Sequence, residues 1–408
     1  MTPVIDSAVA EFQSTPDPAR LWQGAGGSNT CVVGLTRTAR AVDEATAGGA
    51  GQPPTERIAY IDMARGLFLV LMASTHAMTL AGISATSGLG RWGLPRGWAS
   101  TGLTMLCGFM IATLCRRVVD RAQIRARVVR RAKQLLVVMF ASNVVMVTVR
   151  HLVSLETKPL FTLAWWWQFL VLGTEWSISG ILLPIALFLL ISPALIRMRD
   201  ACRSRLHDVV VATAVTLFTG SAWSVRAFAG DSLLRHHVLD VMFGSGLGGF
   251  PIVPIVTSGA LGFFVGTLWQ PVRDRLDART CLAIGVFFIA AGELAGAAPA
   301  IVCPMLTRTV VDLSHFLIIV TLALVLTQWR ASQRALGFVS ALGSCSLLTF
   351  LLHRIFEQML NLGLKPLDVP REVVYAVCVS GGVFGSVGVI LLRRRFAGWN
   401  RALCAVYL

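Results

Sequence analysis

Long apolar runs constrain the fold of this chain more than any other feature. Ten such runs follow one another between residues 62 and 392, and each approaches the roughly 20 residues that a helix needs to cross a bilayer. Charged residues make up only 14% of the sequence, whereas soluble domains carry about 25%. The runs therefore predict an all-α integral membrane protein, a bundle of about ten transmembrane helices with both termini cytosolic.

The expected spans lie near residues 62–83, 98–114, 134–149, 176–196, 206–228, 251–269, 280–298, 309–327, 336–356 and 372–392. The stretch 160–172 is apolar enough to be considered as an eleventh span, but basic residues argue against it because they collect in cytosolic loops. With ten spans, the inner segments hold 21 Lys and Arg and the outer segments hold 8. Trp165, Trp166 and Trp167 then form an aromatic anchor at the outer interface.

Three regions follow from composition. Residues 1–55 lack apolar periodicity and end in Gly and Pro, which predicts a disordered cytosolic tail. Residues 56–395 form the transmembrane domain, and residues 396–408 form a short basic cytosolic tail. The net charge is +15, but no basic-aromatic face of the nucleic-acid-binding kind accompanies it, so the bilayer and not nucleic acid is the expected partner.

The first span carries polar residues that a membrane helix tolerates only at a cost. Arg65 and His76 are eleven residues apart, which places them on one helix face, about 16 Å apart along the axis. A titratable group at this depth indicates a functional site facing a cavity; a neutral His76 bonded to a neighbouring helix is the alternative. Asp62 is expected to pair with Arg65. That pair either anchors the helix or leaves Arg65 to hold a donor phosphate.

Further motifs follow in order along the chain: CGFMIATLCRR, RARVVRRAKQLL, GTEWSISGILLP and ALGSCSLLTFLLHR. Together with Asp62, the Arg65-Gly66 step and the R-x10-H spacing, they resemble the acyltransferase-3 superfamily of integral membrane acyltransferases. That superfamily includes heparan-glucosaminide-acetyltransferase-like and glucan-succinyltransferase-like branches. The resemblance covers about residues 57 to 395. One position departs from it, because Gly180 stands where the family usually has a glutamate.

The resemblance implies a membrane-embedded O-acyltransferase. It would move an acyl group, most simply acetyl, from cytosolic acyl-CoA to a hydroxyl of an extracytoplasmic saccharide or glycan. It assigns the family's essential histidine to His76. Arg127 and Arg130 match its R-x-x-R element and, with Arg116 and Arg117, are expected to bind the acyl-CoA phosphates. Ordinary topology charge in contact with anionic lipid is the alternative for these arginines.

The expected acceptor pocket comprises Trp176, Glu293, His315 and His353. Glu293 either is protonated and hydrogen-bonded or lines the acceptor cavity, and the two histidines are alternatively interface residues. A histidine near neutral pH can take the proton of an attacking hydroxyl. No cysteines pair at CxxC spacing, so neither a metal nor a bound redox cofactor is expected.

The expected location is the cytoplasmic membrane of a bacterium, with a homo-oligomer left open. The alternative function is a transporter or flippase for a lipid-linked saccharide or small polar solute, which would use the same buried charges as a pathway.

Overall fold

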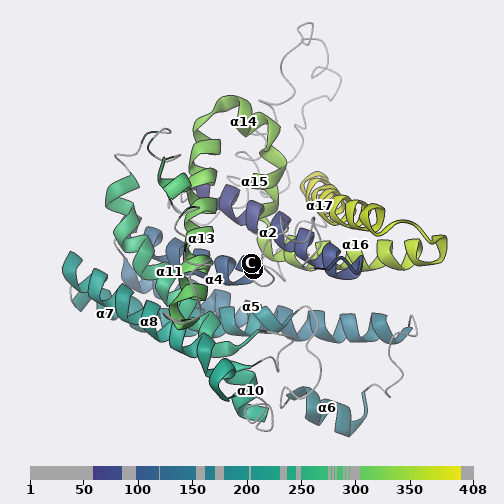
Figure 1. The fold of residues 1–408 in the computed structure, drawn as a ribbon, viewed down its shortest axis with the longest axis horizontal. Coiled ribbons are helices and arrows are strands. Elements are labelled where there is room, and N and C mark those ends of the chain that lie inside the picture. Colours follow the sequence, from purple (N-terminus) through teal and green to yellow (C-terminus); the bar gives the residue numbers. More distant parts are fainter. Residues whose placement is uncertain are drawn as a thin grey trace, which may run out of the picture. The chain divides into compact units, whose positions relative to one another are not determined.

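The computed structural model shows the apolar part of the chain as helices (Figure 1). The described residues are 58–84, 98–118, 120–152, 161–170, 179–201, 204–229, 237–244, 250–273, 277, 280, 283–287, 290, 294 and 304–396. No strand occurs among them, which confirms the all-α prediction for this part of the chain. The expected tail at 1–55 and all but the first residue of the tail at 396–408 lie outside the described residues.

The α-helices have these bounds: α2 Ala59–Leu80, α4 Trp98–Arg117, α5 Arg121–Leu152, α6 Leu163–Leu170, α7 Leu182–Ala201, α8 Arg205–Ala229, α10 His237–Phe243, α11 Ile252–Arg273, α13 Pro304–Gln328, α14 Arg330–Ala335, α15 Gly337–Ser344, α16 Ser346–Leu364 and α17 Arg371–Arg395. Two single 3-10 turns, η2 (Ser179–Ile181) and η3 (Lys365–Leu367), precede α7 and follow α16. Among the described residues, eight helices are long and apolar enough to cross a membrane. A ninth crossing is present if α15 and α16 count as one bent span.

The straight helices match most of the expected spans. The span expected at 280–298 lies mostly outside the described residues. The span expected at 176–196 is shifted, because α7 begins at Leu182. In the described part of the stretch 160–172, the helix is α6, whose 8 residues are fewer than half of the roughly 20 that a crossing needs.

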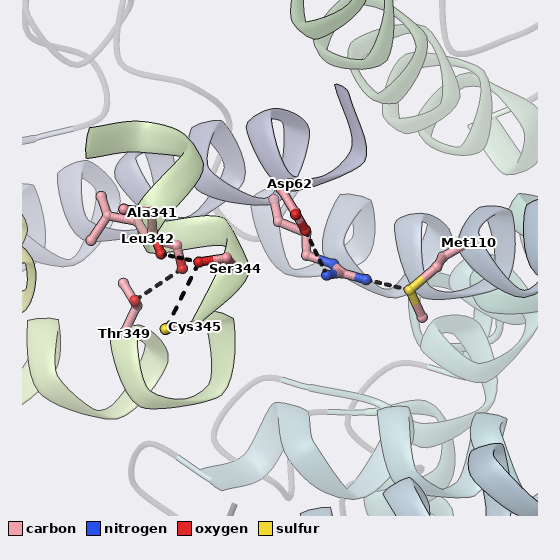
Figure 2. A network of polar contacts seen from close by, with 8 residues as sticks. Asp62, Met110, Ala341, Leu342, Ser344, Cys345 and Thr349 are labelled. Carbon is pink, nitrogen blue, oxygen red and sulfur yellow. Dashed lines mark hydrogen bonds and ion pairs between the residues drawn. The ribbon is translucent and has the colours of Figure 1, made fainter. Parts of the chain in front are cut away.

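The span predicted at 336–356 corresponds to two helices with a sharp bend between them. α15 and α16 meet at 104° on either side of Cys345, whose backbone (φ −111°, ψ 38°) leaves the helical region. Side-chain hydroxyls donate hydrogen bonds to backbone carbonyls beside the break. Ser344 Oγ donates to Ala341 O over 2.8 Å, and Thr349 Oγ1 donates to Leu342 O over 3.1 Å (Figure 2). Ala341 O also accepts the backbone N–H of Cys345 over 3.3 Å, whereas the Thr349 hydroxyl satisfies the carbonyl of Leu342 at the break. Such side-chain bonds stabilise two short helices where hydropathy suggests one.

Helix α2 occupies the centre of the packing, since it contacts α4, α13, α15, α16 and α17. Its contact with α15 is backbone to backbone. A Cβ added to Gly66 would collide with the carbonyl of Val339, and one added to Gly343 would collide with the carbonyl of Asp62. Small residues let membrane helices approach this closely. The Arg-Gly step in the first span therefore has a packing reason beside any functional one.

Large apolar side chains remain exposed in the middle of several helices. Examples are Val137 on α5, Phe218 on α8 and Phe384 on α17, which are 63%, 57% and 61% exposed. A monomeric soluble protein rarely leaves extended surfaces of this kind uncovered. Together with the long apolar helices, they indicate surfaces that face lipid.

Candidate functional site

Arg65 is held between two helices. Its Nη1 lies 3.1 Å from Asp62 Oδ1 one turn earlier on α2, which confirms the expected ion pair. Its Nη2 contacts the sulfur of Met110 on α4 (Figure 2). Both charged side chains are largely buried, with 21% of Arg65 and 16% of Asp62 exposed. These contacts fix the direction of the guanidinium and leave part of it open to the neighbouring cavity.

A cavity of about 320 Å³ lies beside Arg65. Three arginines line it: Arg65, Arg127 and Arg131. The thiol of Cys107 also lines it, and most of the remaining wall is formed by leucine, isoleucine and valine side chains from α2, α4, α5, α7 and α16. The cavity thus combines a cationic group with an apolar wall, which suits a ligand that carries both phosphate and a long apolar arm.

The break between α15 and α16 opens onto the same cavity. Ser344, Ser346 and Leu347, which flank the break, line its wall. The first turn of a helix carries amide N–H groups without helical partners and a partial positive charge. The last turn of α15, which carries a partial negative charge, ends at the same break. The two helix ends therefore present opposite partial charges beside the cavity.

His76 and His353 come together from distant parts of the chain. Their rings stack with centroids 5.6 Å apart and planes 24° apart. Ser74, two residues before His76, hydrogen-bonds the hydroxyl of Tyr375 on α17 over 2.8 Å. This bond ties the part of α2 that carries His76 to α17.

His353 presents one ring nitrogen in a defined form. Its Nδ1 lies 2.9 Å from Thr349 O. Because a carbonyl oxygen only accepts, Nδ1 carries a hydrogen, and the neutral ring leaves Nε2 unprotonated. Nε2 is buried and finds no hydrogen-bond partner among the described residues. An unprotonated imidazole nitrogen in this position can accept a proton from a bound hydroxyl.

Phe350 connects the cavity with the histidines. Phe350 lines the cavity. Its ring packs edge-on against the ring of His353, with the two ring centroids 5.9 Å apart. The histidine pair itself does not line the cavity. The described site thus has two parts along α2, a cationic cavity at Arg65 and a histidine pair at His76, with one aromatic ring between them.

Residues 58–392 match a family described as an acyltransferase domain. The chain belongs to the acyltransferase-3 family. It is a membrane acyltransferase, as the family and the apolar helices together indicate. No curated protein matches the chain significantly.

The donor-binding residues expected from the acyltransferase-3 motifs lie in different places. Arg127 lines the cavity beside Arg65. Arg130 is exposed on α5 and does not line this cavity. Arg116 lines a different cavity, at the C-terminal end of α4, and Arg130 does not line that one either. The side chain of Arg117 lies outside the described residues.

The expected acceptor residues are also divided. Trp176 and Glu293 lie outside the described residues. His315 lies on α13, where its Nδ1 is 2.8 Å from Val311 O, and it does not line the Arg65 cavity. Gly180, which replaces the glutamate usual in the family, is buried in the turn η2 before α7.

The sequence placed Arg131 in the basic element ahead of the third span but ranked it below Arg127 and Arg130, and it did not single out Glu357. Arg131 follows Arg127 by four residues, and that spacing keeps two side chains on one helix face. Glu357 follows His353 by the same spacing on α16 and is completely buried. Its Oε2 lies 3.9 Å from Nη1 of Arg354, with which it forms an ion pair. Helical spacing was the available signal for both residues, once the helices around them were known.

Proposed function

We propose that this protein transfers an acyl group, most simply acetyl, from cytosolic acyl-CoA to a hydroxyl of an extracytoplasmic saccharide or glycan. The observation that carries the proposal is the cavity in which Arg65, Arg127 and Arg131 converge, with Phe350 as its link to the histidine pair. A location in the cytoplasmic membrane of a bacterium belongs to the same proposal.

The cavity suits acyl-CoA as donor. Guanidinium groups bind phosphate through two parallel N–H donors, so the arginines would hold the phosphate-bearing part of the molecule. The apolar wall would accept the pantetheine arm and the acyl group. The thioester would then point toward Phe350, the neighbour of His353.

The histidine pair would supply the base. The acceptor hydroxyl gives its proton to an imidazole nitrogen while its oxygen attacks the thioester carbon. The tetrahedral intermediate collapses, the carbon–sulfur bond breaks, and the proton passes to the departing CoA thiolate. His76 is the family's assigned histidine, and His353 presents the unprotonated Nε2 beside it. An ester and free CoA are the products, and no further reactant is consumed.

The test is transfer by the purified protein. Full-length protein in liposomes would be incubated with acetyl-CoA labelled in the acetyl group and with extracted envelope glycans. We expect alkali-labile label on the glycan, which identifies an O-ester, and we expect none with His76→Gln. Movement of unmodified glycan across the liposome membrane without label transfer would instead support a transporter, the function that the family match disfavours.

A further inference from the structure

Helix α5 is longer than a membrane crossing needs. It contains 32 residues and is therefore about 48 Å long, whereas the hydrocarbon core of a bilayer is about 30 Å thick. Its two halves also differ in charge. Residues 121–133 contain six Lys and Arg and no acid, and residues 134–149 contain no charged residue. The change at residue 133 therefore marks the level at which α5 leaves the headgroup region and enters the hydrocarbon.

Three of the six basic residues face the rest of the protein. Arg121 forms an ion pair with Asp200, whose Oδ1 lies 3.4 Å from its Nε. Arg127 and Arg131 line the Arg65 cavity. These three positions are explained by contacts within the helix bundle and by the proposed donor site.

Arg130 and Lys133 are different, because both side chains are exposed on α5 and neither lines the Arg65 cavity. Within the described part of the chain, neither side chain forms an ion pair or a hydrogen bond. Residues three apart are neighbours on a helix surface, so the two cations lie side by side. They are also the last basic residues before the uncharged half of the helix begins.

The exposed face that carries this pair continues into the apolar half of α5. Val137 and Ala141 follow Lys133 at intervals of four residues, and both are exposed, Val137 to 63%. Val128 and Leu135 are buried. Because successive residues turn by about 100°, these two lie on the opposite side of the helix from Lys133 and Val137. The face with the two cations is therefore the one that α5 turns away from the bundle.

An anionic phospholipid matches both parts of this face. The planar guanidinium of Arg130 can bind two phosphate oxygens, and the ammonium of Lys133 adds a second positive charge beside it. Basic residues next to a membrane crossing attract anionic headgroups. The apolar surface at Val137 begins about one helical turn beyond Lys133, where the acyl chain of such a lipid would start. A soluble phosphate would match the cations but not the apolar surface.

We propose that this face of α5 binds an anionic phospholipid, with its phosphate at Arg130 and Lys133 and an acyl chain along Val137 and Ala141. The proposal gives Arg130, the member of the R-x-x-R element that lies outside the Arg65 cavity, a ligand of its own. The site is independent of the acyl-transfer reaction, so lipid binding can be measured whether or not the protein transfers acyl groups.

The test variant combines Arg130→Gln with Lys133→Gln, which removes both charges and keeps polar side chains at exposed positions. A matched control combines Arg197→Gln with Arg395→Gln. It removes the same charge from exposed positions on two other helices, α7 and α17. A third variant, Arg130→Lys, keeps the charge and removes the planar fork.

The measurement is native mass spectrometry of the purified full-length protein in neutral detergent at constant ionic strength. Dioleoyl phosphatidylglycerol and dioleoyl phosphatidylcholine are titrated separately, and the lipid molecules retained by each protein are counted. The wild type should retain phosphatidylglycerol at lower lipid concentration than phosphatidylcholine. Each Lys or Arg near an anionic lipid surface contributes about fivefold in affinity. The double variant should therefore need about 25-fold more phosphatidylglycerol for the same occupancy.

The control should bind phosphatidylglycerol like the wild type, and Arg130→Lys should lose less affinity than the double variant. The thermal transition of each variant, measured without added lipid, should equal that of the wild type because the exchanged side chains are exposed. Equal phosphatidylglycerol binding by the wild type and the double variant would overturn the proposal. So would an equal loss in the control, which would indicate a general effect of net charge. Displacement of the lipid by inorganic pyrophosphate would also overturn it, by identifying a soluble phosphate as the occupant.

Discussion

The contact between α2 and α15 gives the sharpest test of how this fold positions its site. In Gly66→Ala, the new methyl group would meet the carbonyl of Val339, which cannot rotate away as a side chain would. Forcing an extra methyl into a packed interface costs about 1–3 kcal/mol, and a backbone neighbour favours the upper part of that range. Alanine returns up to about 1 kcal/mol through its better helix propensity. We therefore expect a net loss of about 2 kcal/mol.

Gly388→Ala is the matched control. Gly388 also lies inside a helix, α17, but nothing lies within 4 Å of the position that a Cβ would take. This variant should therefore show only the propensity gain and unfold at the same or a slightly higher temperature than the wild type.

Thermal unfolding can be followed by the intrinsic fluorescence of the chain's 11 tryptophans. Acyl transfer should also fall in Gly66→Ala, because a shift of about 1 Å in catalytic groups can cost a hundredfold in rate. If Gly66→Ala melted and turned over like Gly388→Ala, the close crossing of α2 and α15 would be refuted.

Two further predictions concern the proposed reaction. His76→Gln and His353→Gln should each lower transfer per folded molecule by about a hundredfold or more, the contribution of a positioned base, without lowering the transition temperature; near-normal turnover in either variant would remove that histidine from the reaction. Arg127→Gln combined with Arg131→Gln should raise KM for acyl-CoA at unchanged protein abundance. Arg130→Gln should raise the KM for acyl-CoA less, because Arg130 does not line the cavity. A larger rise of KM in Arg130→Gln than in the double variant would mean that the R-x-x-R motif, and not the cavity, marks the donor site.

Features within one helix could be predicted from the sequence. The pairing of Asp62 with Arg65 follows from spacing alone, as does the common face of Arg65 and His76, because an α-helix converts a residue count into a position. The meeting of His76 with His353 could not be predicted in this way. Each histidine was singled out separately, but only the packing of α2 with α16 brings their rings together.

Two other features depend on information that hydropathy and motifs lack. The break at Cys345 arises from hydroxyl-to-carbonyl bonds such as that from Thr349 to Leu342, and an apolar average over the segment does not register them. The choice between Arg130 and Arg131 depends on how α5 is rotated. Both follow Arg127 within about one turn, and contacts with α4 and α7 decide which of them reaches the cavity.

Helix α2 is unbroken from Ala59 to Leu80. The number of residues between Arg65 and His76 therefore determines both the angle between the two side chains and their separation along the helix axis. One inserted residue would turn one of the two side chains by about 100° relative to the other, while changing their separation by only about 1.5 Å. An insertion of seven residues would nearly restore the angle but lengthen the separation by about 10 Å. Outside the close contact at Gly66, the residues between the two positions can therefore vary in identity more freely than in number. A single-residue insertion should be more damaging than most substitutions in the same segment.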